Sequence, residues 1–358
     1  MSRFLLVDVG AGTMDVLFYD DESGMHYKAV VRSPILCQAE KAASLPGKIL
    51  ITGCEMGGGT IAQVLRARAK ETEIIMTASA AMTLHHNLDR VRAWGIGIVG
   101  EEEADELRSS GRYRVLEFGD LEPERLERIV TGFGVPFEFD VVGVCAQDHG
   151  VPPKGVSHLD YRHNLFKNRL DKDPFPHALL FRSDEVPETF NRLRSIASSA
   201  AMFPTGDVYV MDSGMAAILG ASMDMHASAK QHILVLDVAT SHTVGAALVR
   251  GEIAGYFEYH THDIMLERLE QLLHDLAEGT MAHQQILQEG GHGAYVREVI
   301  GFNAVEVIVA TGPKRRLVEK SRLPITFGAP WGDNMMTGTV GLLEAIRRVE
   351  GMKPLRYL

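Results

Sequence analysis

This 358-residue chain has the composition of a globular protein: 46% of its residues are hydrophobic, 23% are charged, and the formal net charge is −11. The length allows two domains, the negative charge argues against a nucleic-acid partner, and no apolar run is long enough for a membrane helix. The three cysteines (Cys37, Cys54 and Cys145) are too widely spaced for a disulfide framework or an iron–sulfur cluster, and they indicate a reducing cytoplasm.

The first half begins with three short apolar runs divided by turn residues, which predict an antiparallel meander. The runs span 4–9, 16–19 and 26–31. Further strands are expected at 48–52, 141–145 and 208–211, and helices at 59–68, 186–200 and 216–222. Residues 146–185 are rich in Pro, His, Arg and Asp without clear periodicity. We expect an irregular segment there that serves as a lid.

The second half repeats this order of elements. Strands are expected at 232–237, 244–249, 253–259 and 305–310, and helices at 263–278, 313–320 and 334–349. The helix at 263–278 carries leucines at helical spacing, which predicts one apolar face.

Two short matches between the halves indicate a duplication. Residues 4–9 (FLLVDV) resemble residues 233–238 (ILVLDV), and residues 49–53 (ILITG) resemble residues 308–312 (IVATG). Because the matches occur in the same order, we predict two α/β domains of related topology.

The sharpest local signal is the segment from Asp8 to Asp15, DVGAGTMD, between the first two strands. Gly10 and Gly12 have no side chains, so backbone N–H groups there can approach phosphate oxygens closely. The hydroxyl of Thr13 can donate to the same oxygens, and Asp8 can hold a hydrated Mg²⁺. The alternative is a glycine-rich hairpin with an acid at its edge.

This segment resembles the first phosphate loop of the actin, sugar-kinase and heat-shock-chaperone superfamily. Other segments resemble its remaining motifs in the expected order: 212–220 the first connecting helix, 237–243 the second phosphate loop, 307–312 the adenosine motif, and 338–341 the second connecting helix. The resemblance implies duplicated ribonuclease H-like (actin-like ATPase) domains around an interdomain nucleotide cleft. The first domain would span 1–225, with 333–358 packing back onto it, and the second 226–332.

The resemblance also implies the roles of individual residues around Mg²⁺ and ATP. Asp8 and Asp237 would hold the metal. The nucleotide would contact Gly10, Ala11, Gly12, Thr13, Thr240, Thr243, Thr311 and Gly312. The second loop has Ala239 and Ser241 where the superfamily has glycines, and the adenosine motif has one glycine, so weaker nucleotide binding or a different nucleotide is expected.

At the closer level, the chain resembles an uncharacterised prokaryotic family of this superfamily labelled "putative pyruvate formate-lyase activating enzyme". The first loop, residues 53–60 and residues 146–150 carry this resemblance. A radical activase needs three closely spaced cysteines, and this chain has none so spaced.

Residues 146–150 (AQDHG) resemble the Gln-x-His-Gly segment of sugar kinases. Gln147 and His149 would then position a substrate. The resemblance leaves two candidates for the catalytic base, Asp212 and Asp148. Asp212 is alternatively a helix N-cap, and Asp148 and His149 are alternatively parts of a hydrogen-bonded loop.

Two further sets of residues have spacings that suit a ligand. His260 with His262, His158 with His163, and more weakly His85 with His86 are spaced for a metal ion, or are ordinary surface histidines. The glycines of 56–60 either present N–H groups to an anion at a helix start or form a tight turn.

Three functions remain open. The chain is expected to be an ATP-dependent phosphotransferase or ATPase acting on a small-molecule acceptor or coupled to a protein partner. Alternatively, it is an ATP-dependent activator of a redox or radical enzyme, or a nucleotide or metabolite sensor without turnover. Neither nucleic acid nor a membrane is an expected partner.

Overall fold

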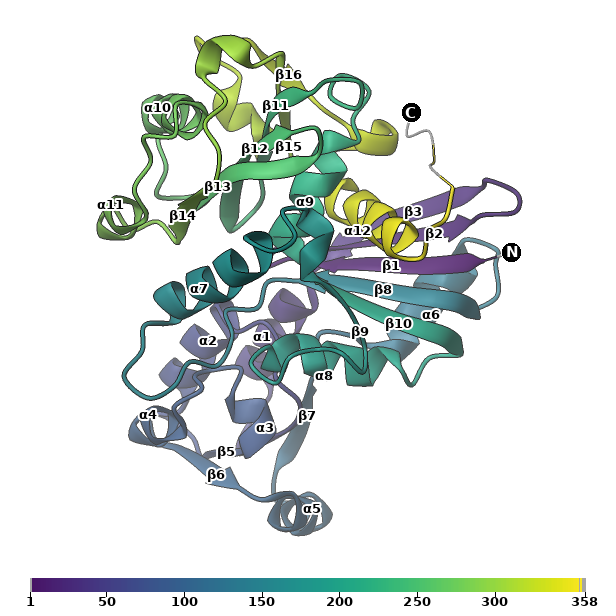
Figure 1. Cartoon of the computed structure of the whole chain (residues 1–358). Coiled ribbons are helices and arrows are strands. Elements are labelled where there is room, and N and C mark those ends of the chain that lie inside the picture. Colours follow the sequence, from purple (N-terminus) through teal and green to yellow (C-terminus); the bar gives the residue numbers. More distant parts are fainter. Residues whose placement is uncertain (1, 354, 356–358) are drawn as a thin grey trace.

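Three β-sheets organise the chain in the computed structural model (Figure 1). The structure describes residues 2–353 and residue 355. Two sheets have six strands each, in the orders β3-β2-β1-β8-β10-β9 and β14-β13-β12-β11-β15-β16, and the third has four, in the order β6-β5-β4-β7. None of the helices in the described part combines the length and apolar character that crossing a bilayer demands.

The first six-stranded sheet contains β1 (Arg3–Val9), β2 (Thr13–Asp20), β3 (His26–Arg32), β8 (Phe139–Ala146), β9 (Leu180–Arg182) and β10 (Thr205–Asp212). The second contains β11 (His232–Val238), β12 (His242–Val249), β13 (Glu252–His260), β14 (Gly293–Val296), β15 (Val307–Thr311) and β16 (Ile325–Phe327). The four-stranded sheet contains β4 (Ile49–Gly53), β5 (Ile74–Thr77), β6 (Ile96–Val99) and β7 (Arg114–Phe118).

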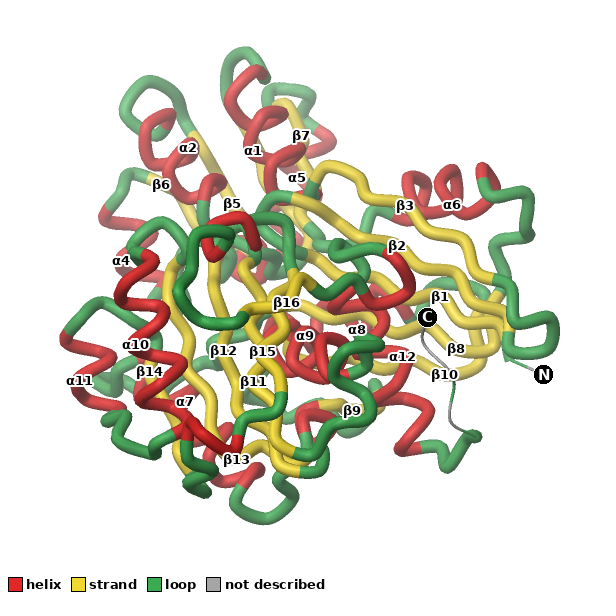
Figure 2. Tube along the Cα trace, turned by 90° about the horizontal axis from the view of Figure 1, so that it is seen from above, coloured by secondary structure: helices red, strands yellow, loops and turns green. Residues whose placement is uncertain are grey.

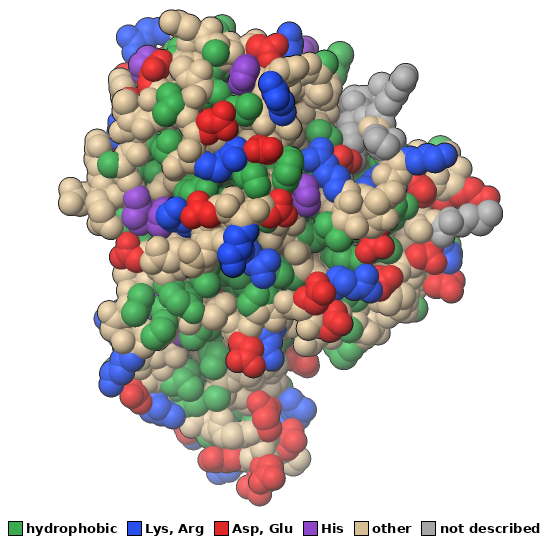
Figure 3. Space-filling view, in the orientation of Figure 1, with side chains coloured by type: hydrophobic (Ala, Val, Ile, Leu, Met, Phe, Trp, Pro, Cys, Tyr) green, Lys and Arg blue, Asp and Glu red, His purple; other side chains and the backbone are tan. Residues whose placement is uncertain are grey.

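The helices are α1 (Pro34–Ser44), α2 (Thr60–Arg68), α3 (Ala78–Ala81), α4 (Leu88–Ala93), α5 (Glu101–Ser109), α6 (Pro123–Gly132), α7 (His158–Leu170), α8 (Asn191–Ala200), α9 (Ser213–Ser222), α10 (Leu266–Ala277), α11 (His283–Gln288) and α12 (Thr337–Val349). Four 3₁₀ turns are Pro176–Leu179, Phe302–Ala304, Arg315–Val318 and Pro330–Gly332. Charged side chains of both signs are interspersed over the face shown in Figure 3.

Five strands of each six-stranded sheet share one topology, while the sixth lies at opposite edges, β9 beside β10 and β14 beside β13. In the first, β1 and β3 flank β2 antiparallel, and β1, β8 and β10 run parallel. In the second, β11 and β13 flank β12 antiparallel, and β11, β15 and β16 run parallel. This is the ribonuclease H-like arrangement twice over, so the predicted α/β fold with actin-like ATPase halves is confirmed. The apolar run of β1 is buried from Phe4 to Val7 because both faces of this sheet are covered.

The second of the two sequence matches between the halves does not reflect this repeat. Strand β4, which contains the 49–53 match, lies in the four-stranded sheet, whereas β8 occupies the place beside β1 that β15 occupies beside β11. Gly53 and Gly312 both have positive φ, at 94° and 87°. The shared Thr-Gly therefore reflects the same turn chemistry after a buried strand rather than equivalent positions.

Two predicted elements were wrong. Residues 146–185 are not irregular throughout, because they contain the 13-residue helix α7. Its buried stripe consists of Arg162, Phe166 and Leu170, and the charged residue in it conceals the apolar periodicity. The helix predicted at 313–320 is only a 3₁₀ turn at Arg315–Val318.

Helices α9 and α12 cross each other between the two six-stranded sheets (Figures 1 and 2). An added Cβ at Gly220 would lie 1.9 Å from the carbonyl oxygen of Thr337, and one at Gly341 would lie 1.8 Å from that of Ala216. Helix α12 also contacts β1 and β8. The domain boundary expected at residues 225/226 stays a prediction, and residues 354 and 356–358 of the segment expected to pack back lie outside the described residues.

The crossing of α9 and α12 predicts that Gly341→Ala destabilises the protein. The new methyl group meets backbone, which cannot rotate away, and such overpacking costs about 1–3 kcal/mol. The midpoint of urea denaturation measures this loss. Gly132→Ala in α6 is the matched control, because its Cβ meets nothing within 4 Å. A control that loses as much stability as Gly341→Ala would contradict the close crossing.

Candidate active site in the interdomain cleft

A cleft of about 900 Å³ lies between the two ribonuclease H-like halves. Both the β1–β2 turn and the β11–β12 turn line it. So do most of the predicted site residues: Asp8, Gly10, Ala11, Gly12, Thr13, Gln147, Asp148, His149, Asp237, Thr240 and Gly312. Three predicted residues are not part of its lining. Thr243 and Thr311 are fully buried within their strands, and Asp212 is buried at the N-cap of α9.

The two turns are closed by the same backbone hydrogen bond, and they face each other. The N–H of Gly10 donates to the carbonyl oxygen of Thr13 at 3.0 Å, and the N–H of Ala239 donates to that of His242 at 3.1 Å. An added Cβ on Gly12 would lie 2.8 Å from Cγ2 of Thr240 in the opposite turn. The two halves therefore meet at these turns, and a side chain at position 12 would force them apart.

An acid stands at the end of each central strand, beside its turn. Gly338 adjoins Asp8, since a Cβ there would lie 1.9 Å from Oδ2 of the acid, and Gly312 adjoins Asp237, where the distance to Oδ1 would be 2.7 Å. The hydroxyl of Thr311 donates to Oδ1 of Asp237 at 3.1 Å. Thr311, which was predicted to contact adenosine, therefore contacts this carboxylate through its hydroxyl.

The carboxyl groups near the strand ends have too little positive charge around them to compensate their own negative charge. Burial raises the pKa of Asp8 to about 7 and that of Asp237 to about 6. Asp15, opposite Asp8 in the β1–β2 register, was not predicted as a site residue. Its pKa is raised to about 8 by burial and by the charge of Asp8, and its Oδ1 has no hydrogen-bond partner among the described residues. A cation bound at this cluster would relieve these costs.

The loop of residues 147–150 is fixed beside the cleft by hydrogen bonds within the loop and to other elements. Oδ1 of Asp148 accepts from the N–H of Gly150 at 2.8 Å, and Oδ2 accepts from that of Leu193 at 3.0 Å. Burial raises the pKa of Asp148 to about 6. Gln147 donates through Nε2 to Glu258 of the second half. Asp148 therefore shapes this loop in addition to lining the cleft.

A buried guanidinium, which the sequence did not single out, joins the two halves. Nη2 of Arg162 on α7 lies 3.0 Å from Oδ2 of Asp212, and its Nη1 lies 2.6 Å from Oε2 of Glu258 on β13. Burial raises the pKa of Asp212, although Arg162 opposes this shift. Asp212 also caps α9 by accepting from the N–H of Met215 at 3.1 Å. Both carboxylate oxygens of Asp212, one of the two predicted bases, are therefore occupied by contacts within the protein.

The glycine-rich segment 56–60 lines the cleft just before α2. The N–H of Met56 donates to the hydroxyl of Thr83 at 3.0 Å, and that of Gly57 donates to Oδ1 of Asp120 at 3.2 Å. These two N–H groups are already satisfied, which favours the tight-turn interpretation for this part of the segment.

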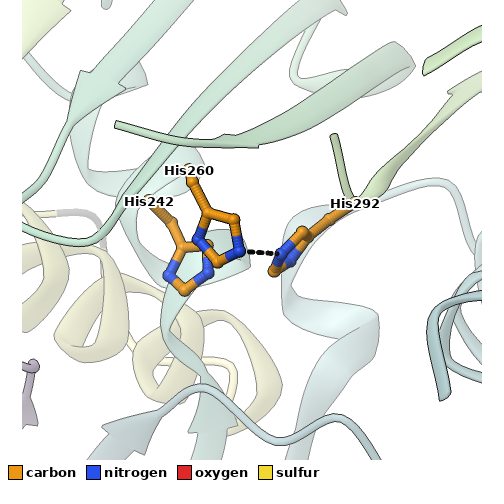
Figure 4. Close-up of side chains that lie close together, drawn as sticks. All are labelled: His242, His260 and His292. Atoms are coloured by element: carbon orange, nitrogen blue, oxygen red, sulfur yellow. Dashed lines mark hydrogen bonds between the residues drawn. The ribbon is translucent and has the colours of Figure 1, made fainter. Parts of the chain in front are cut away.

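The histidines gather differently from the predicted pairs. His163 stacks on His283, with ring centroids 3.6 Å apart, whereas His158 lies near His86, with ring centroids 5.6 Å apart. His260 groups with His242 and His292 rather than with His262 (Figure 4). Neither His242 nor His292 was predicted, because their spacing from His260 matches no local motif.

Replacement of Arg162 tests how much the bridge between the halves contributes. Arg162→Ala leaves two buried carboxylates facing each other without a cation, and such a loss costs about 3–5 kcal/mol of unfolding free energy. Lys167→Ala is the control on the same helix. It removes an exposed 2.7 Å ion pair with Asp171 and a cation–π contact with Tyr295, and should cost about 1 kcal/mol. Equal urea midpoints for the two variants would argue against the bridge.

Several solved structures are similar to the chain over nearly its whole length. A ROK hexokinase from Thermus thermophilus is 12% identical, with a TM-score of 0.33, over 98% of this chain and 99% of its own. A ROK family glucokinase from Streptomyces griseus, solved with glucose and AMPPNP, is 10% identical, with a TM-score of 0.32, over 96% and 97%. A Bacteroides thetaiotaomicron protein of unknown function with an actin-like ATPase fold is 7% identical, with a TM-score of 0.34, over 91% and 90%.

Sequence comparison identifies the family. No curated protein matches the chain. The family model described as "Putative pyruvate format-lyase activating enzyme (DUF1786)" matches residues 56–317, which include strands β5, β6 and β7 of the four-stranded sheet, the 147–150 loop and most of the second half. Because this match spans more than two thirds of the 358 residues, the chain belongs to that family.

Proposed function

We propose that the cleft binds Mg-ATP, with the phosphates between the β1–β2 and β11–β12 turns, and that the protein transfers or hydrolyses the terminal phosphoryl group. One observation carries the proposal: two turns of identical backbone pattern, one from each half, face each other, and each follows a strand that ends in an undercompensated acid.

The first turn suits phosphate oxygens better than the second does. Gly10 and Gly12 leave the backbone accessible, and Thr13 adds a hydroxyl. In the second turn, Thr240 is the polar residue that lines the cleft. Thr243 is assigned a structural role, because its hydroxyl is buried and bonded to that of Thr261 at 3.0 Å. Gly312, between Asp237 and the cleft, remains the candidate contact for adenosine.

Asp8 and Asp237 are the proposed ligands of Mg²⁺, with Asp15 adding negative charge behind Asp8. Mg²⁺ prefers carboxylate oxygens and keeps several waters, so two carboxylates suffice. The metal would neutralise phosphate charge during transfer, while the turns orient the phosphates and the two halves exclude water.

Of the two candidate bases, Asp148 fits better than Asp212. Asp148 lines the cleft beside Gln147 and His149, which are the proposed contacts of an acceptor, and its pKa of about 6 is close to neutrality. Asp212 is buried between Arg162 and the start of α9, which suits a positioning role. The acceptor is a small molecule or a water.

Nucleotide sensing without transfer is the second candidate function. Both oxygens of Asp148 accept backbone N–H groups, so this carboxylate is committed to the fold as well as to the cleft. A protein that uses nucleotide only to close its cleft requires no free base. The activator alternative rests on the family description alone.

Isothermal titration with Mg-ATP and Asp8→Asn tests the proposed site. The substitution keeps the size of the side chain and removes its charge. If Asp8 holds Mg²⁺, the affinity should fall at least about 100-fold, or about 2.7 kcal/mol. The exposed Asp184→Asn, which is not part of the cleft lining, should leave affinity unchanged.

The direction of the effect makes this test decisive. If no metal mediates binding, removing a carboxylate that repels phosphate should strengthen the affinity instead, which would overturn the assignment of Asp8. Release of ADP at saturating Mg-ATP, with and without candidate acceptors, then separates transfer or hydrolysis from sensing. Binding without any ADP release would select the sensor.

A further inference from the structure

We infer that His242, His260 and His292 form a second metal site in the cleft, one for a transition-metal dication such as Zn²⁺. The three side chains come from separate segments: the start of β12, the end of β13 and the residue before β14. One ring nitrogen from each lies within 4.8 Å of the others, and the three side chains lie close together (Figure 4).

The distances between the rings are close to those of a metal site. Nε2 of His260 lies 3.0 Å from Nε2 of His292. Metal–nitrogen bonds of about 2.0–2.1 Å place the nitrogens of a tetrahedral site about 3.3 Å apart. The ring centroids of the three pairs are 4.4, 4.6 and 4.7 Å apart. Small side-chain rotations would therefore complete the site without movement of the strands.

Two buried nitrogens of the cluster have no hydrogen-bond partner among the described residues, Nε2 of His242 and Nδ1 of His292. A buried polar atom without a partner is costly, and a ligand that is not a protein group would satisfy Nε2 of His242.

Polar groups lie beside the other nitrogens of two of the rings. Nδ1 of His292 lies 3.4 Å from Oε1 of Glu258, and Nδ1 of His242 lies 2.9 Å from Oγ of Ser241. Glu258 is itself fixed by Arg162 and Gln147. A carboxylate behind a histidine ligand orients the ring and raises its basicity, and this pattern is usual around protein-bound metals.

The donor set distinguishes this site from the proposed Mg²⁺ site. Three imidazole nitrogens favour Zn²⁺ and other late transition metals, whereas Mg²⁺ prefers oxygen. Three protein ligands leave a position for water or for a ligand in the cleft, next to His149, whose ring centroid lies 5.6 Å from that of His292. His242 also occupies the place in the second turn that Thr13 holds in the first. The altered second turn thus supplies a metal ligand.

Titration of the metal-stripped, full-length protein with Co²⁺ tests the site directly. Unaltered protein should bind about one equivalent and acquire the visible absorption of Co²⁺ held by nitrogen ligands, and Zn²⁺ should displace it. His292→Ala should weaken binding at least about 100-fold. His262→Ala is the matched control, because this exposed histidine lies beside His260 but outside the cluster, and it should bind as the unaltered protein does.

Two additions keep the test decisive. His260→Asn, at a less buried position, replaces His292→Ala if that variant does not fold, as judged by circular dichroism of the metal-free proteins. Asp8→Asn should retain Co²⁺ binding, so that failure of the nucleotide site and failure of this site are told apart. The inference is overturned if the unaltered protein binds no Co²⁺, or if loss of His262 weakens binding as much as loss of His292.

Discussion

The buried guanidinium of Arg162 is the constraint on which the rest of the cleft depends. It joins Asp212 at the start of α9 to Glu258 on β13, so one side chain spans both ribonuclease H-like halves. Burial opposes ionisation of Glu258, but Arg162 holds its pKa well below the usual range. Because Glu258 stays charged, its carboxylate can accept a hydrogen bond from Gln147 and also lie close to Nδ1 of His292. The acceptor side of the proposed active site and the proposed histidine site therefore share one anchor.

The two turns at the base of the cleft are alike in backbone and different in chemistry. Gly10, Gly12 and Thr13 correspond to Ala239, Ser241 and His242, and the bridging hydrogen bond is preserved. The first turn has the small residues that the proposed contact between phosphate and the backbone requires. The second has a histidine in place of the threonine and a serine that holds that histidine. We interpret the second turn as one that contributes less to phosphate binding and more to the histidine site.

The sequence predicted the fold and the main acids of the cleft for a clear reason. Asp8 and Asp237 are each the penultimate residue of an apolar strand that leads into a turn. This pattern lies within a few consecutive residues, so it can be recognised without knowledge of the fold. Arg162 was missed because a charged residue within a buried helical stripe looks like a break in the apolar pattern. The histidine cluster was missed because its members meet only through the pairing of β12, β13 and β14. The false match at residues 49–53 arose because a strand followed by a positive-φ glycine recurs wherever such a turn is needed.

The central claim is that both turns bind one ligand together, and hydrogen exchange of backbone amides tests it most directly. With Mg²⁺ and a non-hydrolysable ATP analogue, exchange should slow in residues 10–13 and in residues 239–242 at the same nucleotide concentration, because a ligand between the turns protects both. Protection of neither turn, or of one turn alone, would contradict the shared site.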